Sequence, residues 1–338
     1  MVAKSLPVAL LVGAASATCP LSVDITNSDS HVVNVAVTNT GNETLSVFKG
    51  NTVFSNHATR DLLVTDAEGK ALPFEGVFVN YKRTGLSPSS FQKIDAGETV
   101  TVSVNAAHSY KLDGVSQASV TAIQGFRYAV GAEAPSSFKD LASCADVTSG
   151  QVEVVPDQTT AAEQHISRRG EEPFNSRIQK RAVTYSSCST SQTTALKTSV
   201  ADAISMANAA YTAAGSGSYY FTTWFKSTSV QSKISCADTY GDCADGSALL
   251  YTVPSANVIV PCPDNGFWDF SEFAAQCAGD DYDRAGSVLH EMTHLYGTTD
   301  WAYGPTAAKA LSATKAAANA DTYEMYAESV RLGGCTTG

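Results

Sequence analysis

The stretch LHEMTHLYGTTDWAYG, residues 289–304, places His290 and His294 four residues apart. Apolar residues recur here at helical spacing, so we expect a helix that starts at Asp281 or Asp283 and ends at the following glycine. Residues four apart on a helix lie on the same side, one turn from each other. Both imidazoles can therefore reach one metal ion. The alternative is a surface helix that carries two histidines by chance, but histidine is rare in this chain, with 6 residues in 338.

Glu291 follows the first histidine directly and is the candidate general base. A zinc ion lowers the pKa of a bound water and polarises a carbonyl group, and a carboxylate beside it can take the proton from that water. The pattern therefore predicts a zinc site suited to hydrolysis.

A catalytic zinc site takes three protein ligands and leaves one position open. After residue 182 the chain has no third histidine, so the candidates are the carboxylates Asp300, Asp321, Glu324 and Glu328. Their spacing does not choose among them. Ligation by Glu324 or Glu328 would indicate a gluzincin-like peptidase, and a secreted protein that binds zinc without catalysis is a further alternative.

The start of the chain predicts export. Residues 1–17 combine a lysine, a short apolar run and a small-residue pattern at the end, which is typical of a secretory signal peptide. No apolar stretch approaches the roughly 20 residues that a membrane span needs. Of the eight cysteines, two lie before residue 150 and six after residue 187. We therefore expect a secreted, extracellular protein with two separately disulfide-bonded units.

The chain divides near its middle. Residues 18–150 alternate apolar and polar residues in short runs such as HVVNVAVTNTG and GVFVNYKR, which is typical of an all-β sandwich. Residues 151–181 are polar and predict an exposed linker, which ends in the dibasic pair Lys180 and Arg181. Cleavage there would make the first block a removable propeptide and 182–338 the mature unit. The alternative is a solvated, charged tether.

Charge narrows the range of partners. Residues 182–338 carry seven Lys and Arg against fifteen Asp and Glu, a net −8 out of −11 for the whole chain. This charge disfavours nucleic acid and favours basic substrates. We expect a monomer with no nucleic-acid or membrane partner.

The motif GTxDxxYG follows HExxH and is formed by Gly297, Thr298, Asp300, Tyr303 and Gly304. This combination resembles the deuterolysin family of fungal secreted zinc metalloendopeptidases, the aspzincins. The resemblance covers residues 182–338, and the preceding block is similar to the propeptides of this family. It implies an α+β, zincin-like, helix-rich catalytic domain behind an all-β sandwich-like propeptide. It also implies a zymogen that acts on polypeptides.

Site residues follow from the resemblance position by position. It implies one zinc ion held by His290, His294 and Asp300. Glu291 would be the general base, and Tyr303 would donate a hydrogen bond to the oxyanion. Because the stretch between the second histidine and the glycine is short, Asp300 must turn back tightly. The resemblance also implies three disulfides, Cys188–Cys236, Cys243–Cys262 and Cys277–Cys335.

Two further acidic residues have a predicted role beside the metal. Asp321 matches a family aspartate that either binds the metal or supports a ligand histidine, and we expect support, because a metal-bound imidazole usually donates its other N–H to such a group. Glu324 is similar to a residue of the related peptidyl-lysine metalloendopeptidases. Asp321 and Glu324 lie one helical turn apart, so both could face a lysine in the S1′ pocket. The alternative is that Glu324 is solvated surface.

Overall fold

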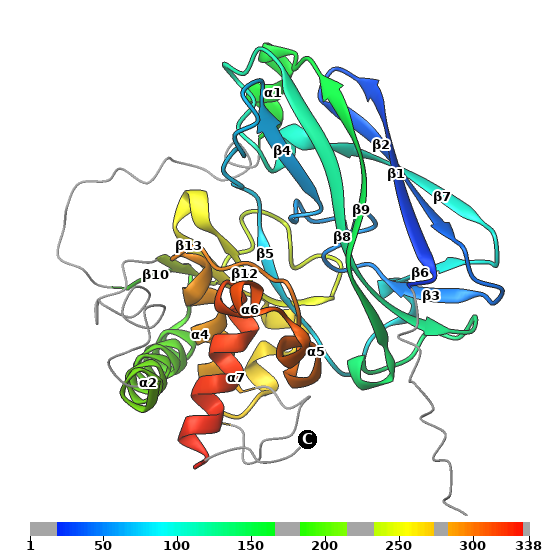
Figure 1. Ribbon diagram of the computed structural model, residues 1–338. Helices are drawn as coiled ribbons and strands as arrows, with labels where there is room; N and C mark the ends of the chain where they lie inside the picture. Colours follow the sequence, from blue (N-terminus) through cyan, green and yellow to red (C-terminus); the bar gives the residue numbers. More distant parts are fainter. Residues whose placement is uncertain (1–18, 166–182, 215–232, 274–282, 334–338) are drawn as a thin grey trace, which may run out of the picture.

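The computed structural model describes residues 19–165, 183–214, 233–273 and 283–333 (Figure 1). The strands are β1 (Leu21–Asp29), β2 (Val32–Asn39), β3 (Leu45–Phe48), β4 (Leu62–Asp66), β5 (Phe78–Tyr81), β6 (Phe91–Ile94), β7 (Thr99–Asn105), β8 (Ala118–Val130), β9 (Ala142–Val154), β10 (Thr184–Ser186), β11 (Lys233–Ser235), β12 (Ala248–Val253) and β13 (Val258–Pro261). The helices are α1 (Gln158–Gln164), α2 (Thr190–Ala214), α4 (Arg284–His294), α5 (Pro305–Ala310), α6 (Ala313–Ala317) and α7 (Ala320–Arg331). None of the helices in these ranges is long and apolar enough to cross a membrane. The mixture of sheets and helices agrees with the α+β class expected from the sequence.

The N-terminal unit, residues 19–165, contains two antiparallel sheets. One has the strand order β1-β2-β7, and the other has the order β4-β8-β3-β6 with β9 paired to β8. In β2 the side chains of Val33, Val35 and Val37 are buried, because successive side chains of a strand point to opposite faces. Apolar residues of both sheets form one hydrophobic cluster, and the disulfide Cys19–Cys144 joins the start of the unit to β9.

The N-terminal unit extends past residue 150, where we expected a linker to begin. Strand β9 continues to Val154, and α1 follows after Asp157, whose side chain accepts a hydrogen bond from the backbone N–H of Thr160. Ala161 lies in the hydrophobic cluster of the sheets. The expectation of a linker is therefore wrong for residues 151–164, because Val152, Val154 and Ala161 pack in the hydrophobic cluster of the sheets. Residues 166–181, with Lys180 and Arg181, lie outside the described residues.

The C-terminal unit, residues 183–333, packs helices on a mixed sheet with the order β10-β11-β13-β12-β5. Strands β10, β11 and β13 are parallel, and β12 is antiparallel to its neighbours. Helices α2, α4 and α7 share a hydrophobic cluster with this sheet. At Gly286 in α4, an added Cβ would lie 2.5 Å from Glu328 Oε1 of α7, so the glycine permits the close approach of these two helices.

Strand β5 belongs by sequence to the N-terminal unit but pairs with β12 of the other unit. We expected its segment, GVFVNYKR, to form part of the β sandwich, and the structure corrects this. All four residues of β5 are buried, which suits a strand covered on both faces. Figure 1 shows β5 descending between the two units. A third hydrophobic cluster joins the units, with Val79 and Tyr81 packed beside Tyr251 and Val253.

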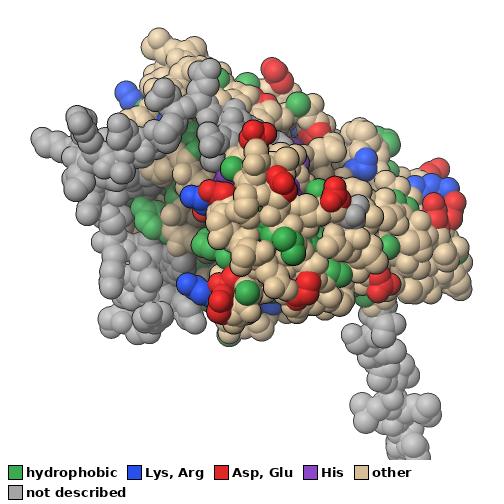
Figure 2. Space-filling view, turned by 90° about the horizontal axis from the view of Figure 1, so that it is seen from above, with side chains coloured by type: hydrophobic (Ala, Val, Ile, Leu, Met, Phe, Trp, Pro, Cys, Tyr) green, Lys and Arg blue, Asp and Glu red, His purple; other side chains and the backbone are tan. Residues whose placement is uncertain are grey.

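Acidic side chains are numerous on one face of the molecule. In the space-filling view of Figure 2, Asp and Glu side chains are spread over the visible face, in keeping with the net charge of −11. Lys and Arg side chains form no continuous basic patch on this face.

Candidate metal centre and catalytic site

Helix α4 carries the two histidines and the glutamate through the interior of the C-terminal unit. Asp283 begins the helix by accepting a hydrogen bond from the backbone N–H of Gly286 at 2.5 Å. Every residue of the helix from Ala285 to His294 is buried. The imidazole rings of His290 and His294 lie 4.9 Å apart, centre to centre. The side of the helix predicted to bind a metal therefore points away from solvent.

The chain after α4 turns back so that Asp300 reaches both histidines. Gly297 has a φ of 97°, in the left-handed region that favours glycine, and its N–H donates to the carbonyl of His294 at 3.0 Å. The hydroxyls of Thr293 and Thr298 are hydrogen-bonded at 2.7 Å and close the turn. Asp300 Oδ1 then lies 3.1 Å from His290 Nε2 and 3.3 Å from His294 Nε2. The structure therefore brings the three implied ligands together.

These three residues fit a metal ion. His290 Nε2, His294 Nε2 and both carboxylate oxygens of Asp300 are buried, and none of them makes a hydrogen bond of good geometry. Around a tetrahedral zinc with bonds of about 2.0–2.1 Å, two ligand atoms are about 3.3 Å apart. The distances from the Asp300 oxygen to the two nitrogens match this separation. A buried polar atom without a partner is costly, and one metal ion would provide a partner for all three residues.

The opposite ring nitrogens are already hydrogen-bonded. The Nδ1–H of His294 donates to the carbonyl of Thr298 at 3.2 Å, which leaves Nε2 with its lone pair. His290 Nδ1 lies 3.2 Å from both Asp321 Oδ1 and Glu324 Oε2. Asp321 and Glu324 therefore lie behind the ring of His290, on the far side from Asp300.

A second group of potential ligands lies on that far side. Oxygen and nitrogen atoms of His290, Asp321 and Glu324 come within 4.8 Å of one another. However, the Arg83 guanidinium is 2.5 Å from Asp321 Oδ1 and 3.5 Å from Glu324 Oε2. Because a cation already occupies this position, the site beside Asp300 is the better place for a metal.

Glu291, the candidate general base, is held in place by a hydrogen bond. Its Oε2 accepts a hydrogen bond from the hydroxyl of Thr252 at 2.5 Å, and its Oε1 has no partner. Burial raises the pKa of Glu291 to about 7, although the nearby histidines oppose this rise. A carboxylate whose pKa lies close to neutral can both accept and return a proton.

The charges of the ligand residues depend on one another. Burial disfavours the charged form of His290, but the carboxylates that contact its ring raise its pKa well above the usual value. Burial also opposes ionisation of Asp300, yet the imidazoles of His294 and His290 hold the pKa of Asp300 below its usual range. Asp300 is therefore a carboxylate in this site.

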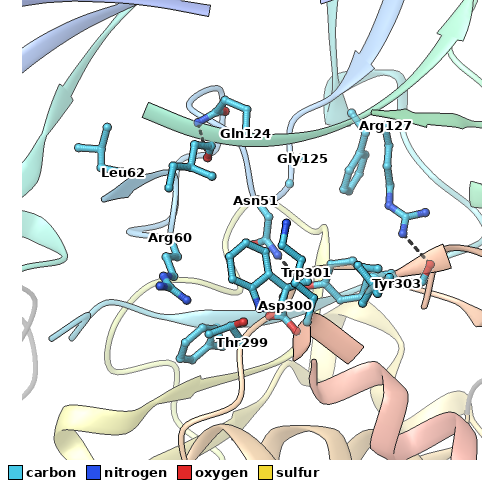
Figure 3. A pocket seen from close by; sticks show the side chains of 17 residues that line it. Asn51, Arg60, Leu62, Gln124, Gly125, Arg127, Thr299, Asp300, Trp301 and Tyr303 are labelled. Carbon is cyan, nitrogen blue, oxygen red and sulfur yellow. Dashed lines mark hydrogen bonds between the residues drawn. The ribbon is translucent and has the colours of Figure 1, made fainter. Parts of the chain in front are cut away.

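Tyr303, the expected oxyanion donor, contacts the N-terminal unit. Its hydroxyl donates to the carbonyl of Val79 and accepts from Asn51 Nδ2, both at 2.7 Å. The Arg127 guanidinium donates to the backbone carbonyl of Tyr303 at 2.6 Å, as Figure 3 shows. Asp300 and Tyr303 line a pocket between the units together with these N-terminal side chains. The Tyr303 hydroxyl thus donates to a peptide carbonyl, the same kind of group that an oxyanion donor would bind in a substrate.

Sequence reasoning missed the N-terminal residues that enter this site. The ring of Phe78 stacks on His294 with 4.2 Å between centres and 7° between planes. Arg83 is 1% exposed, whereas its neighbour Lys82 is partly exposed. Nothing in the local pattern separates these two basic residues. Only the tertiary contact with α7 reveals the role of Arg83.

Two disulfides fix the framework of the C-terminal unit. Cys188–Cys236 joins the start of α2 to the end of β11, and Cys243–Cys262 joins the segments that flank β12 and β13. These are two of the three bridges that the resemblance implied. Cys277 and Cys335 lie outside the described residues.

Comparison with known proteins identifies the family of this chain. Residues 3–235 match the model of the deuterolysin metalloprotease (M35) family, and residues 227–328 match that of lysine-specific metallo-endopeptidases. The chain is 32% identical to a neutral protease 2 homolog of Phaeosphaeria nodorum over 93% of this chain and 91% of that protein. It is 31% identical to a neutral protease 2 homolog of Sclerotinia sclerotiorum, over 93% and 90% of the two chains. The chain therefore belongs to the deuterolysin (M35) family of metalloproteases.

Proposed function

We propose that this chain is the precursor of a secreted endopeptidase that holds one zinc ion between His290, His294 and Asp300. The observation that carries the proposal is the convergence of three buried ligand residues whose donor atoms lack other partners. Two nitrogens and one carboxylate are ligands that zinc favours in catalytic sites. The test is digestion of casein by the processed chain, with Glu291→Gln as the inactive control.

The residues around the metal position have separate roles in peptide hydrolysis. When bound, zinc lowers the pKa of water and polarises the scissile carbonyl. Glu291 accepts the proton of the attacking water and passes it to the leaving amine, while Thr252 holds its other oxygen in place. Tyr303 donates to the carbonyl oxygen as negative charge develops there. Asp321 orients His290 from behind.

The gluzincin-like alternative places Glu324 or Glu328 on the metal. Glu324 contacts His290 through Nδ1, whereas Asp300 contacts the same ring through Nε2. Glu328 points at the start of α4, where its Oε1 is the atom nearest to Gly286. Neither carboxylate lies beside both Nε2 atoms, so the positions favour Asp300 as the third ligand.

The precursor organisation follows from the same proposal. Residues 1–17 would direct export, and cleavage after Lys180 and Arg181 would release 182–338 as a monomeric catalytic domain with a zincin-like fold. The disulfides and the family membership support an extracellular protein. The N-terminal unit would be the β-sandwich propeptide, because β5 and Asn51 cover the residues proposed for catalysis.

The acidic pair beside His290 favours basic substrates. Asp321 and Glu324 are fully buried, and the group that they bind in the precursor is a guanidinium, that of Arg83. After removal of the N-terminal unit, these two carboxyl groups would lose the guanidinium of Arg83. A lysine after the scissile bond would restore the lost ion pair, which supports an S1′ preference for lysine.

Glu324→Gln is expected to weaken that preference in the processed enzyme. A hydrogen bond to a charged group contributes about 1.5–3 kcal/mol, so the enrichment of lysine at P1′ should fall by roughly 10-fold or more. Mass spectrometry of casein digests measures the cleavage-site profile. Glu328→Gln, on the same helix, is the matched control and should keep the wild-type profile. A wild-type profile without lysine enrichment, or one that Glu324→Gln leaves unchanged, would remove this part of the proposal.

An ion pair between the units makes their association depend on pH. His57 Nδ1 lies 2.8 Å from Asp242 Oδ1, and His57 Nε2 lies 3.1 Å from Asp245 Oδ2. Burial lowers the pKa of His57, but these two carboxylates raise it to about 9. The pKa is thus higher in the complex than in a separated unit, where His titrates near 6.5. The stabilisation is complete below about pH 6.5 and is lost as the pH rises through about 9.

For the precursor cleaved in its linker, we expect the dissociation constant of the two units to rise by up to roughly 100-fold between pH 6 and pH 10. Isothermal titration calorimetry across this range measures the effect. His57→Gln should remove most of the pH dependence. An equal dependence in wild type and His57→Gln would show that another group is responsible.

A further inference from the structure

Strand β5 binds to the edge of the catalytic sheet as an added strand. It pairs antiparallel with β12, with Phe78 opposite Thr252 and Val79 opposite Tyr251. Thr252 is the residue whose hydroxyl holds Glu291. Extended peptides commonly bind proteins by adding a strand to a sheet edge. In the precursor, the edge beside the catalytic glutamate is therefore occupied by a segment of the same chain.

The segment crosses the site in a fixed order. Phe78 stacks on His294. The carbonyl of Val79 accepts a hydrogen bond from the hydroxyl of Tyr303. Further along, Arg83 forms ion pairs with Asp321 and Glu324. The chain therefore runs from one ligand histidine, past the expected oxyanion donor, to the acidic pair behind the other histidine.

Asn80 follows the Val79 carbonyl and faces the same helix as Phe78. Opposite residues of an antiparallel pair share a face, and Asn80 pairs with Leu250, which lies in the cluster formed with α4. Asn80 is 0% exposed, and neither its amide oxygen nor its amide nitrogen has a hydrogen-bond partner. An unpaired amide thus stands at the first position after the carbonyl that Tyr303 holds.

We propose that residues 78–83 bind the catalytic unit as a pseudosubstrate, with the Val79–Asn80 peptide bond in the position of the scissile bond. The proposal rests on the endopeptidase function proposed above. The side chain after the scissile position is then the uncharged Asn80. Arg83, three residues further along the chain, pairs with Asp321 and Glu324 in its place. The N-terminal unit and the substrates compete for the same cleft. The backbone of a bound substrate pairs with β12, as that of β5 does in the precursor.

The register can be tested by turning the segment into a substrate. The precursor is kept intact by Lys180→Ala and Arg181→Ala, and Asn80→Lys is combined with Arg83→Ala so that the new side chain can enter the vacated acidic pocket. We expect a single new cut between residues 79 and 80, located by mass spectrometry. Asn80→Met with Arg83→Ala is the matched control, similar in length but uncharged, and should remain whole. Adding Glu291→Gln to the lysine variant should abolish the cut.

The outcomes separate this proposal from the endopeptidase function. A cut at another bond of the segment overturns the proposed register. If the processed wild-type enzyme digests casein at lysine and the test chain is still not cut, the proposal is overturned as well. If the processed form digests no polypeptide at all, the endopeptidase proposal itself fails.

A second measurement needs no lysine preference and no folded variant of the whole precursor. The N-terminal fragment released by processing is added back to the catalytic unit during hydrolysis of a fluorogenic peptide. Competition predicts that the apparent KM rises linearly with the fragment concentration while kcat stays constant. A fragment with Phe78→Ala and Arg83→Ala should inhibit at least tenfold more weakly, whereas Lys93→Ala, at an exposed residue of β6, should inhibit like wild type. A fall in kcat at constant KM, or no inhibition, contradicts the proposal.

Discussion

Glu291→Gln in the processed chain is expected to reduce casein hydrolysis by about 10²–10⁴-fold, the range that general acid–base groups contribute. The amide cannot accept a proton, yet it keeps the size of the side chain and can still accept the hydrogen bond of Thr252. Because Glu291 is not one of the proposed ligands, the variant should retain its zinc. The measurements are the initial rate of casein digestion and the zinc content of the same preparation.

The matched control for this variant is Glu272→Gln. Glu272 pairs with Arg284 at 3.1 Å at the start of α4, far from the proposed ligands along the helix. It should leave the rate within about twofold, since part-exposed ion pairs contribute little. A Glu291→Gln enzyme that digests casein at the wild-type rate would show that another group transfers the proton.

Asp300→Ala is expected to lose both metal and activity. Residues that only support a metal ligand already contribute about 10–100-fold to metal affinity, so loss of a direct ligand should weaken zinc binding by more than about 100-fold. Competition with a chelator of known affinity measures this change. The substitution also leaves the Nε2 atoms of His290 and His294 buried without a partner.

Glu328→Ala is the informative comparison for Asp300→Ala. Glu328 is buried in α7, and burial together with Glu324 and Asp283 raises its pKa to about 9, so it is a protonated acid near neutral pH. Its loss should leave zinc affinity unchanged within about threefold. If Asp300→Ala kept its zinc while Glu328→Ala or Glu324→Ala lost it, the gluzincin-like alternative would replace the present ligand set.

Local sequence patterns anticipated the parts of the site that lie close together along the chain. The positions of His290, Glu291 and His294 follow from the period of a helix, and an aspartate cap at position 283 begins it. Asp300 lies only six residues beyond the helix, and Gly297 provides the left-handed turn that returns it. Residues this close along the chain can adopt only a few relative positions, so the sequence alone predicts their arrangement.

Contacts between distant segments were not predictable in this way. The four residues of β5 are compatible with a strand of the N-terminal sheets and with a strand of the C-terminal sheet, because both units offer an apolar surface. The ion pair of Arg83 with Asp321 joins residues 238 positions apart, so no local spacing connects them. The same holds for α1, whose single buried side chain, Ala161, carries little signal in a polar stretch.

The most direct test of the account is the position of zinc in crystals of the processed chain, measured by anomalous scattering at the zinc absorption edge. The account predicts one strong peak bounded by His290 Nε2, His294 Nε2 and Asp300. An active enzyme without a peak there, or with its peak between Asp321 and Glu324, would contradict it.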